Sequence, residues 1–197
     1  MKEMWDQRYA IEDYVYGTEP NSFFKSFIDT LQPGRLFLPG EGEGRNAVYA
    51  AGLGWEVVAQ DYSVVAREKA LDLARRQKLH IQYHVGNVNE INLDLGSFDL
   101  IAIIFLHMSS SERELLHKNM ISLLNPGAYI LMEAFEKRQI DYKTGGPPNV
   151  DYLYQLEDIK SDFGVLKTIK AIEESIILDS NLAHKGEGRV IQYIGKR

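Results

Sequence analysis

Residues 35–53 read RLFLPGEGEGRNAVYAAGL, an apolar run followed by a glycine-rich turn and an alanine-rich amphipathic run. This order predicts a strand at 35–38, a turn at Pro39-Gly40 and a helix over 46–53 that ends at Gly54. Glycines at a strand-to-helix turn permit a tight bend and let a ligand approach the free N–H groups of the helix start. The stretch therefore predicts the first half of a βαβ unit with a ligand site at its turn.

Short apolar runs alternate with longer amphipathic runs along the rest of the chain, which is typical of a three-layer doubly wound α/β sheet. Residues 136–152 are rich in turn formers and predict a long loop, and the last two strands are expected to pair antiparallel. Further strands are expected at 55–60, 80–85, 98–106, 128–135, 165–178 and 189–194, and further helices at 3–11, 22–30, 64–78, 109–124 and 155–163.

Composition limits the class of protein. A length of 197 residues favours one domain, and 28 acidic against 22 basic residues give a net charge of −6, which predicts no nucleic-acid partner. The absence of cysteine excludes disulfide scaffolds and thiolate nucleophiles. No signal peptide or apolar run of about 20 residues is found, so we expect a cytoplasmic protein without a membrane partner. The five histidines lack ligand-like spacing, so no metal is expected.

Asp61 ends the second expected strand, 61 − 40 = 21 residues after Gly40. In a doubly wound fold a carboxylate at this place accepts both hydroxyls of a ribose, so the spacing predicts a nucleoside-type cofactor. The glycine pattern is G-x-G-x-G, with Arg45 where a dinucleotide fingerprint has its third glycine. Glu41 and Glu43 would repel a pyrophosphate but tolerate a cationic sulfonium. The loop therefore favours S-adenosylmethionine over a nicotinamide dinucleotide.

Residues 36–49, LFLPGEGEGRNAVY, resemble motif I of class I S-adenosylmethionine-dependent methyltransferases, and the Gly-Arg-Asn-Ala continuation is similar to the tellurite-resistance and thiopurine methyltransferase branch. Residues 5–9 with 16–21, residues 105–109 and TGGPP at 144–148 resemble the N-terminal lid and two loops of that branch. The resemblance covers essentially the whole chain. It implies a Rossmann-like seven-stranded sheet whose last strand is antiparallel. Within a single domain, 1–197, we expect an N-terminal helical lid at 1–31, a cofactor-binding core at 32–135 and an acceptor side at 136–197.

The resemblance also implies which residues hold S-adenosylmethionine and its product S-adenosylhomocysteine. The glycine loop would face the methionine part, Asp61 the ribose and Tyr62 the adenine, while Asn87 stands where the family usually has the Asp that accepts from the adenine amine. The family also has Asp where this chain has Leu38, so we hypothesise that Glu41 reaches the ammonium of the cofactor. The expected cofactor-contacting residues are Gly40, Glu41, Gly42, Gly44, Asn46, Asp61, Tyr62, Asn87, Val88 and Phe105.

Methyl transfer is an in-line displacement, so orientation and exclusion of water are the main tasks of the protein. His107 follows the fourth strand and is the candidate general base; the alternative is a histidine that fills space at the strand end. Aromatic residues near the N-terminus could lay rings against the sulfonium, or pack as ordinary core on the sheet edge. The expected lid and acceptor residues are Trp5, Tyr9, Tyr14, Tyr16, Thr144 and His184.

Three functions stay open at this point. The first is a methyltransferase that acts on a small molecule such as a thiol or, as the resemblance implies, a metalloid oxyanion such as tellurite. The second is a nicotinamide-dependent oxidoreductase, which Asp61 supports and Arg45 opposes. The third is a protein that binds S-adenosylmethionine without turning it over, since Leu38, Glu41 and Asn87 depart from the family pattern. The chain is expected to be a monomer or a homodimer.

Overall fold

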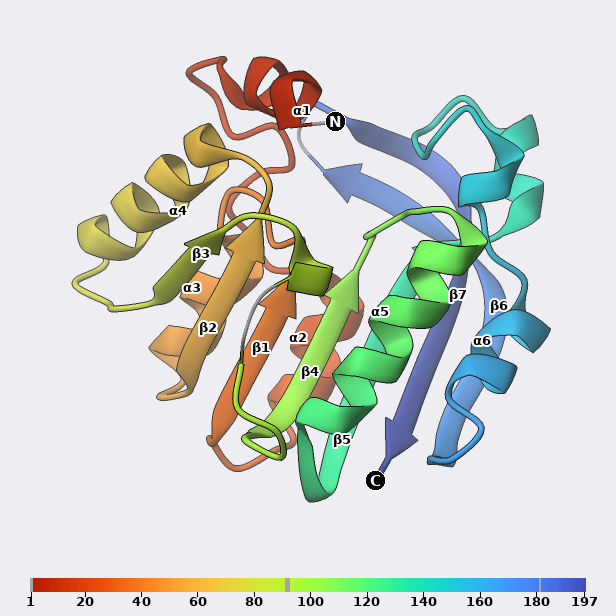
Figure 1. Cartoon of the computed structure of the whole chain (residues 1–197). Helices are drawn as coiled ribbons and strands as arrows, with labels where there is room; N and C mark the ends of the chain where they lie inside the picture. The colour runs from red at the N-terminus through yellow and green to blue at the C-terminus, as the bar shows by residue number, and fades with distance from the viewer. Residues whose placement is uncertain (1, 91–92, 181) are drawn as a thin grey trace.

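The computed structural model describes residues 2–90, 93–180 and 182–197. The described residues form a seven-stranded sheet with the order β3-β2-β1-β4-β5-β7-β6 (Figure 1). Strands β1 to β5 pair in parallel, and β7 pairs antiparallel with both β5 and β6. The expected doubly wound sheet with an antiparallel last strand is therefore confirmed. The strands are β1 (Arg35–Pro39), β2 (Glu56–Asp61), β3 (Gln82–Val85), β4 (Phe98–Ile104), β5 (Leu124–Phe135), β6 (Lys167–Ser180) and β7 (His184–Lys196).

Helices cover both faces of the sheet and complete the three layers (Figure 1). Ser63 accepts a hydrogen bond from the backbone of Ala66, and Ser109 forms a capping box with Glu112, so the two longest helices begin where side-chain caps stand. The helices are α1 (Lys2–Tyr9), α2 (Ser22–Ile28), α3 (Arg45–Gly52), α4 (Val64–Arg76), α5 (Ser110–Leu123) and α6 (Leu156–Asp162).

The core consists mainly of two apolar layers separated by the central strands. Alternate residues of a strand point to opposite faces, so Leu36 and Leu38 pack in the layer beneath α2, α3 and α4. Phe37 and Ile101 pack in the layer beneath α5 and α6. Both faces of β1 and β4 are buried, which explains why their sequences are continuous apolar runs rather than alternating ones.

The structure differs from the sequence expectation mainly at element ends. Strand β5 begins at residue 124 rather than 128, because Leu124 already pairs with Phe98 ahead of a register shift. Strand β7 begins at His184 rather than 189, because the hairpin pairing extends to residues 180 and 184. The glycines of that hairpin indicate a loop in the sequence, but the backbone of the opposite strand supplies partners for them. The expected loop 136–152 contains two short 3-10 turns, Lys137–Asp141 and Val150–Tyr152.

The parallel strands all end at one edge of the sheet, where the loops after β1, β2 and β4 gather. Helix α1 lies above this edge, and the β6–β7 hairpin arches toward it from the other side (Figure 1). This is the edge at which doubly wound folds bind ligands. Among the described residues, no helix is long and apolar enough to cross a bilayer. The division into lid, core and acceptor side stays a prediction.

Candidate active site

The glycine loop turns sharply between β1 and α3. Gly40 and Gly42 have φ angles of +67° and +63°, in the left-handed region that favours glycine. A Cβ at Gly42 would lie 2.8 Å from the hydroxyl of Tyr9, and a Cβ at Gly40 would lie 2.8 Å from the side chain of Leu106. The loop is therefore packed between the N-terminal segment and the loop after β4, and a side chain at Gly40 or Gly42 would clash.

Asp61 joins this loop to the end of β2. One carboxylate oxygen accepts from the N–H of Gly42 at 3.1 Å, and the other accepts from the N–H of Ser63 at 3.0 Å. Tyr83 donates from its hydroxyl to the carbonyl of Gly42 at 2.6 Å, so both backbone groups of this glycine are held. Burial raises the pKa of Asp61 to about 6. Tyr83 escaped the sequence analysis because an isolated tyrosine in a short strand carries no signal of its partner.

Glu41 points into the protein and caps α3. Its Oε1 accepts from the backbone N–H groups of Asn46 and Ala47, both at 2.8 Å, and its Oε2 accepts from the side chain of Asn46 at 3.2 Å. Gly44 stands at the N-cap and has no side chain to do this, so the carboxylate takes over the capping role. Burial raises the pKa of Glu41 to about 7. Its expected contact with the cofactor ammonium stays a prediction and would require these bonds to be released.

Asn46 is also turned inward, because its side-chain oxygen accepts from the backbone N–H of Asn21 at 2.9 Å. It therefore links the start of α3 to the start of α2. The structure brings Asn46 next to the glycine loop, as expected, but gives its side chain protein partners on both polar atoms. Its contact with the cofactor stays a prediction.

Glu43 holds the N-terminal segment against the loop. Its Oε2 accepts from the N–H of Val15 at 2.8 Å, and its Oε1 lies 2.5 Å from the ammonium of Lys69 on α4. The same ammonium donates to the carbonyls of Ile11 at 3.0 Å and Asp13 at 2.7 Å. Glu43 and Lys69 therefore hold residues 11–16, which we call the strap, against the glycine loop. Sequence reasoning missed Lys69, because one lysine on a helix carries no signal that it contacts a segment more than fifty residues away.

The expected adenine side lies at the loops after β2 and β3, which are adjacent because Asp61 pairs with Val85. Tyr62 is half-buried there. Asn87 accepts from the N–H of Asn89 at 3.1 Å and donates to Glu90 at 2.9 Å, and Val88 is buried. The structure thus brings Tyr62, Asn87 and Val88 to the expected place, while their contacts with a cofactor stay predictions.

Three of the four expected lid aromatics form a row of rings that reaches the terminal hairpin. Trp5 stacks on Tyr9 with 5.5 Å between ring centroids, Tyr9 meets Tyr16 at 6.4 Å, and Tyr16 meets His184 at 5.0 Å. Tyr14 lies apart, since its hydroxyl donates to a backbone carbonyl of α4 at 3.1 Å. The row joins the N-terminal segment to the start of β7 across the edge where the parallel strands end.

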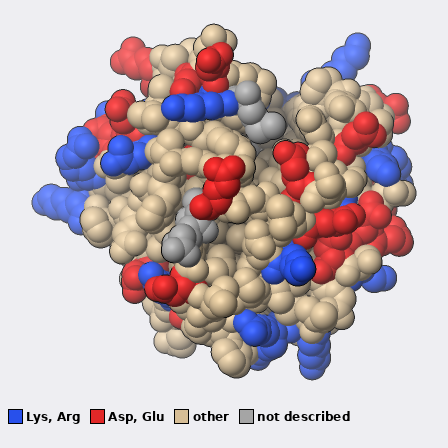
Figure 2. All heavy atoms as spheres, in the orientation of Figure 1, with Lys and Arg blue, Asp and Glu red and all other residues tan. Residues whose placement is uncertain are grey.

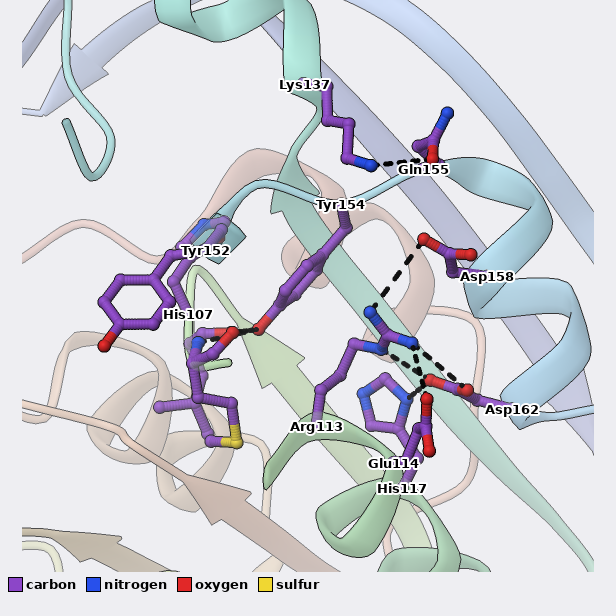
Figure 3. A network of polar contacts seen from close by, with 12 residues as sticks. His107, Arg113, Glu114, His117, Lys137, Tyr152, Tyr154, Gln155, Asp158 and Asp162 are labelled. Carbon is purple, nitrogen blue, oxygen red and sulfur yellow. Dashed lines mark hydrogen bonds and ion pairs between the residues drawn. The ribbon is translucent and has the colours of Figure 1, made fainter. Parts of the chain in front are cut away.

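His107 has both ring nitrogens in backbone hydrogen bonds. Nδ1 donates to the carbonyl of Tyr152 at 2.7 Å (Figure 3), and Nε2 accepts from the N–H of Phe135 at 3.3 Å. Burial lowers the pKa of His107 to about 4, so the ring is neutral. As a general base it would first have to release the N–H of Phe135. The geometry matches the alternative of a histidine that organises a strand end, and the catalytic role stays a prediction.

A buried polar network lies next to His107 and the loop after β4 (Figure 3). The hydroxyl of Tyr154 accepts from the N–H of Met108 at 2.8 Å, and the guanidinium of Arg113 lies over the Tyr154 ring at 5.4 Å. Asp162 of α6 accepts from Arg113 and from His117 of α5, each at 2.7 Å. The network fixes the loop after β4 against α5 and α6. The sequence gives no signal for it, because its partners are 45 or more residues apart.

The loop after β5 docks on the hairpin. Thr144 donates from its hydroxyl to the carbonyl of Glu187 at 2.7 Å, and its own carbonyl accepts from the N–H of Lys185 at 3.2 Å. A Cβ at Gly145 would lie 2.3 Å from the ring of His184. The structure therefore brings the expected acceptor loop and His184 together.

Phe105 directly follows β4 and has a φ of +51°, a left-handed conformation that is rare for an aromatic residue. Its N–H donates to the carbonyl of Glu133 at 2.8 Å, which helps to hold this conformation. The ring lies 4.7 Å from that of Phe135 and 5.5 Å from that of His184. Backbone strain of this kind clusters at functional sites, where it aims a side chain.

The electrostatic character of the molecule is mixed. Figure 2 shows acidic and basic side chains interspersed over the face that it presents. Within the part of the chain that the structure describes, no group of three or more histidine or acidic side chains could hold a metal ion. The expected absence of metal, nucleic-acid and membrane partners stays a prediction.

Comparison with known proteins agrees with this fold. Residues 39–127 match the family described as methyltransferase domain. Among curated proteins, Hemagglutinin 1 of Eikenella corrodens is 26% identical over 117 residues, which are 58% of this chain. The chain spans 39% of the length of that relative.

Solved structures are similar over the whole chain. A structure from work on the conversion of a disulfide bond into a thioacetal group during echinomycin biosynthesis has a TM-score of 0.79 and 16% identity, covering 100% of this chain and 92% of the other. TehB from Haemophilus influenzae has a TM-score of 0.75 and 15% identity, covering 100% and 66%. A methyltransferase from Methanosarcina mazei has a TM-score of 0.71 and 15% identity, covering 91% and 98%. At these identities the likeness establishes the fold.

The parallel sheet, the glycine loop and the acid at the end of β2 define a nucleoside-binding doubly wound protein. The matched domain narrows this: residues 39–127 are similar to a methyltransferase domain, and the sheet order agrees with the fold of class I methyltransferases, whose methyl donor is S-adenosylmethionine. The match supports the expected enzyme class and cofactor. Assignment to the tellurite-resistance and thiopurine branch stays a prediction.

Proposed function

We propose that the protein transfers the methyl group of S-adenosylmethionine to a small-molecule acceptor by direct in-line displacement. The observation that carries the proposal is the arrangement of Asp61, whose carboxylate ends β2 and holds Gly42 of the glycine loop at 3.1 Å. A ribose laid along this edge would find a hydroxyl acceptor in Asp61 and, once the hydroxyl of Tyr9 moves off Gly42, backbone that it can approach closely. The proposal therefore depends on Asp61 more than on any other side chain.

The cofactor would lie across the ends of β1, β2 and β4. The backbone of Gly40 to Gly44 would contact its methionine part, Tyr62 and Val88 would contact the adenine, and Phe105 would face the methyl group. The chemistry comes from the sulfonium, whose C–S bond breaks as the acceptor attacks. The tasks left to the protein are orientation and exclusion of water, and the strap held by Glu43 is suited to the second task.

The acceptor is proposed to be small, since the row of rings and the loop 144–148 pack together over this edge of the sheet. Thiols and metalloid oxyanions such as tellurite are the first classes to test. The motif resemblance to tellurite-resistance and thiopurine methyltransferases supports them, as does the likeness to a structure connected with conversion of a disulfide to a thioacetal.

Calorimetric titration with S-adenosylhomocysteine tests the cofactor assignment. Wild type should bind, and Asp61→Ala should lose about 1–3 kcal/mol of binding free energy, the cost of leaving hydroxyl partners unpaired. Asp72→Ala, at an acid on the surface of α4 that pairs with Arg75 and Arg76, serves as the matched control and should bind as wild type does. Equal affinity for Asp61→Ala and Asp72→Ala would refute the assignment.

Two alternatives are separated by simple measurements. A nicotinamide-dependent oxidoreductase would be stabilised against heat by NAD(H) and not by S-adenosylmethionine. A binding protein without turnover would bind S-adenosylhomocysteine and yet methylate no member of a panel of thiols, phenols, selenite and tellurite.

A further inference from the structure

His184 stands at the centre of an aromatic cluster, which we define as Tyr16, Phe105, Phe135 and His184. Its ring centroid lies 5.0 Å from that of Tyr16, 5.5 Å from that of Phe105 and 5.2 Å from that of Phe135. These rings come from the N-terminal segment, the end of β4, the end of β5 and the start of β7. Tertiary folding therefore gathers them at the edge where the cofactor is proposed to bind.

His184 carries a polar atom that the protein leaves unused. Only 7% of the residue is exposed, and Nδ1 has no hydrogen-bond partner among the described residues. Burying an imidazole nitrogen without a partner costs free energy, so such atoms in native structures indicate a function or a missing ligand. His107, by contrast, has partners on both of its nitrogens.

The electrostatic surroundings keep this ring neutral. Burial, together with the nearby positive charges of Arg45 and Arg8, lowers the pKa of His184 to about 4. With Nε2 carrying the ring proton, Nδ1 is a hydrogen-bond acceptor. A bound molecule with a hydrogen-bond donor would therefore satisfy Nδ1.

The cluster is continuous with the glycine loop. Phe105, which contacts His184, is followed by Leu106, and the side chain of Leu106 closes on the position of Gly40. Tyr16 also contacts His184, and it belongs to the segment whose backbone N–H groups donate to Glu43 of the glycine loop. A small molecule taken into the cluster would therefore lie beside both His184 and the glycine loop, where the sulfonium is proposed to bind.

We propose that His184 receives the proton of the methyl acceptor, and that the acceptor is a small neutral thiol taken into the aromatic cluster. This inference rests on the proposed function. In the step, a lone pair of the thiol sulfur attacks the methyl carbon as the bond from that carbon to the sulfonium sulfur breaks, and its electrons neutralise the sulfonium. The thiol proton passes to Nδ1 of His184 and then to water, so the positive charge moves from sulfonium to imidazolium.

The walls of the cluster favour sulfur over an oxyanion. Polarisable sulfur makes favourable contacts with aromatic rings, whereas a hydrated oxyanion would lose its water on entry. The two nearest cations are engaged with Tyr16: Arg8 donates to its hydroxyl and Arg45 to its carbonyl, each at 3.2 Å. A thiol, with an ordinary pKa of about 8.5, also gives up its proton more easily than a phenol at about 10.

The test compares benzyl mercaptan, phenol, selenite and tellurite as acceptors for the full chain, with methyl transfer measured by mass spectrometry. Variants are His184→Phe, which keeps a ring without the nitrogen, and His184→Gln, which keeps polarity but cannot hold a proton. His84→Phe, at an exposed residue of β3, is the control. Calorimetry with S-adenosylhomocysteine is run on every variant, so loss of the cofactor site is seen separately from loss of acceptor chemistry.

Wild type should methylate benzyl mercaptan best. Both His184 variants should bind S-adenosylhomocysteine within twofold of wild type yet lose about 100-fold or more in kcat/KM at pH 7, the usual contribution of a proton acceptor. At pH 9 they should recover much of this, because a thiolate has no proton to give up. His84→Phe should match wild type throughout.

Several results would overturn the inference. These are unchanged kcat/KM in both His184 variants at pH 7, an equal loss at pH 7 and pH 9, and a wild-type preference for phenol or an oxyanion. Failure of wild type to bind S-adenosylhomocysteine would instead refute the proposed function on which the inference rests.

Discussion

Glu43 and Lys69 form an ion pair of 2.5 Å that joins the glycine loop to α4 beneath the N-terminal segment. The carboxylate and the ammonium each also bond the backbone of that segment, Glu43 to Val15 and Lys69 to the carbonyls of Ile11 and Asp13. From the sequence, Glu43 could face a cationic ligand. In the structure it holds the N-terminal segment instead. The ligand-binding edge and the N-terminus are therefore energetically connected.

Replacing Glu43 by Gln should loosen this strap. The nearly buried ammonium of Lys69 loses its charge partner, so we expect the free energy of unfolding to fall by about 1–3 kcal/mol. Hydrogen exchange at the N–H of Val15 should accelerate. Urea unfolding and exchange measured by NMR check this. Glu56→Gln, which breaks an exposed pair with Arg35, should cost at most about 1 kcal/mol. Equal effects of the two substitutions would contradict the role of Glu43.

Asp61 should make cofactor affinity depend on pH. Burial raises the pKa of Asp61 to about 6, and the ionised carboxylate is the form that accepts hydroxyl donors. Below pH 6 binding must therefore be preceded by loss of a proton, and affinity for S-adenosylhomocysteine should fall about tenfold for each pH unit. Calorimetry between pH 5 and pH 7.5 measures this. Asp61→Asn should bind weakly with little pH dependence, and a flat wild-type profile would show that the prediction is wrong.

Glu41 should make stability fall as pH rises. Its folded pKa of about 7 exceeds the ordinary value of 4.5, so the folded state holds a proton that the unfolded state has lost. The associated stability is present below about pH 4.5 and is lost as the pH rises to about 7, with a size of about 3 kcal/mol. Urea unfolding of wild type and Glu41→Gln at pH 5.0, 6.0 and 7.5 tests this sign. The stability of wild type relative to the variant should decrease across the series, and a constant difference would be the contrary result.

Asp162 should be essential to the network behind the loop after β4. Asp162→Ala leaves Arg113, whose side chain is 5% exposed, without its closest charge partner, and should cost about 3–5 kcal/mol. Asp158→Ala is the matched control on the same helix: it lies 4.0 Å from Arg113 and is much more exposed, so it should cost less than about 1 kcal/mol. Comparable losses for both variants in thermal or urea unfolding would disprove the distinction.

The order of elements is predictable from residue patterns because local signals agree with the final fold. The run 35–53 sets the first strand, turn and helix, and the caps at Ser63 and Ser109 place two more helices within a few residues. Element ends are less predictable. His184 begins a strand rather than a loop, since the pairing that extends the hairpin depends on the opposite strand.

The candidate site is likewise predictable from the sequence only in part. Spacing alone puts Asp61 beside the glycine loop, because parallel strands end at one edge and a βα unit has a nearly fixed length. The direction in which each side chain points does not follow from spacing. Glu41 and Asn46 turn inward to cap and brace α3, and His107 is saturated by two backbone groups from the other half of the chain.

The sequence by itself determined the doubly wound order of strands, the glycine turn and the acid that follows the second strand, since these are properties of short segments and fixed spacings. Tertiary structure decided the partners. Lys69 beneath the strap, Tyr83 on the glycine loop and the unpartnered nitrogen of His184 each depend on contacts between segments more than forty residues apart. Such contacts form only when packing brings distant chain together, and no local pattern encodes them.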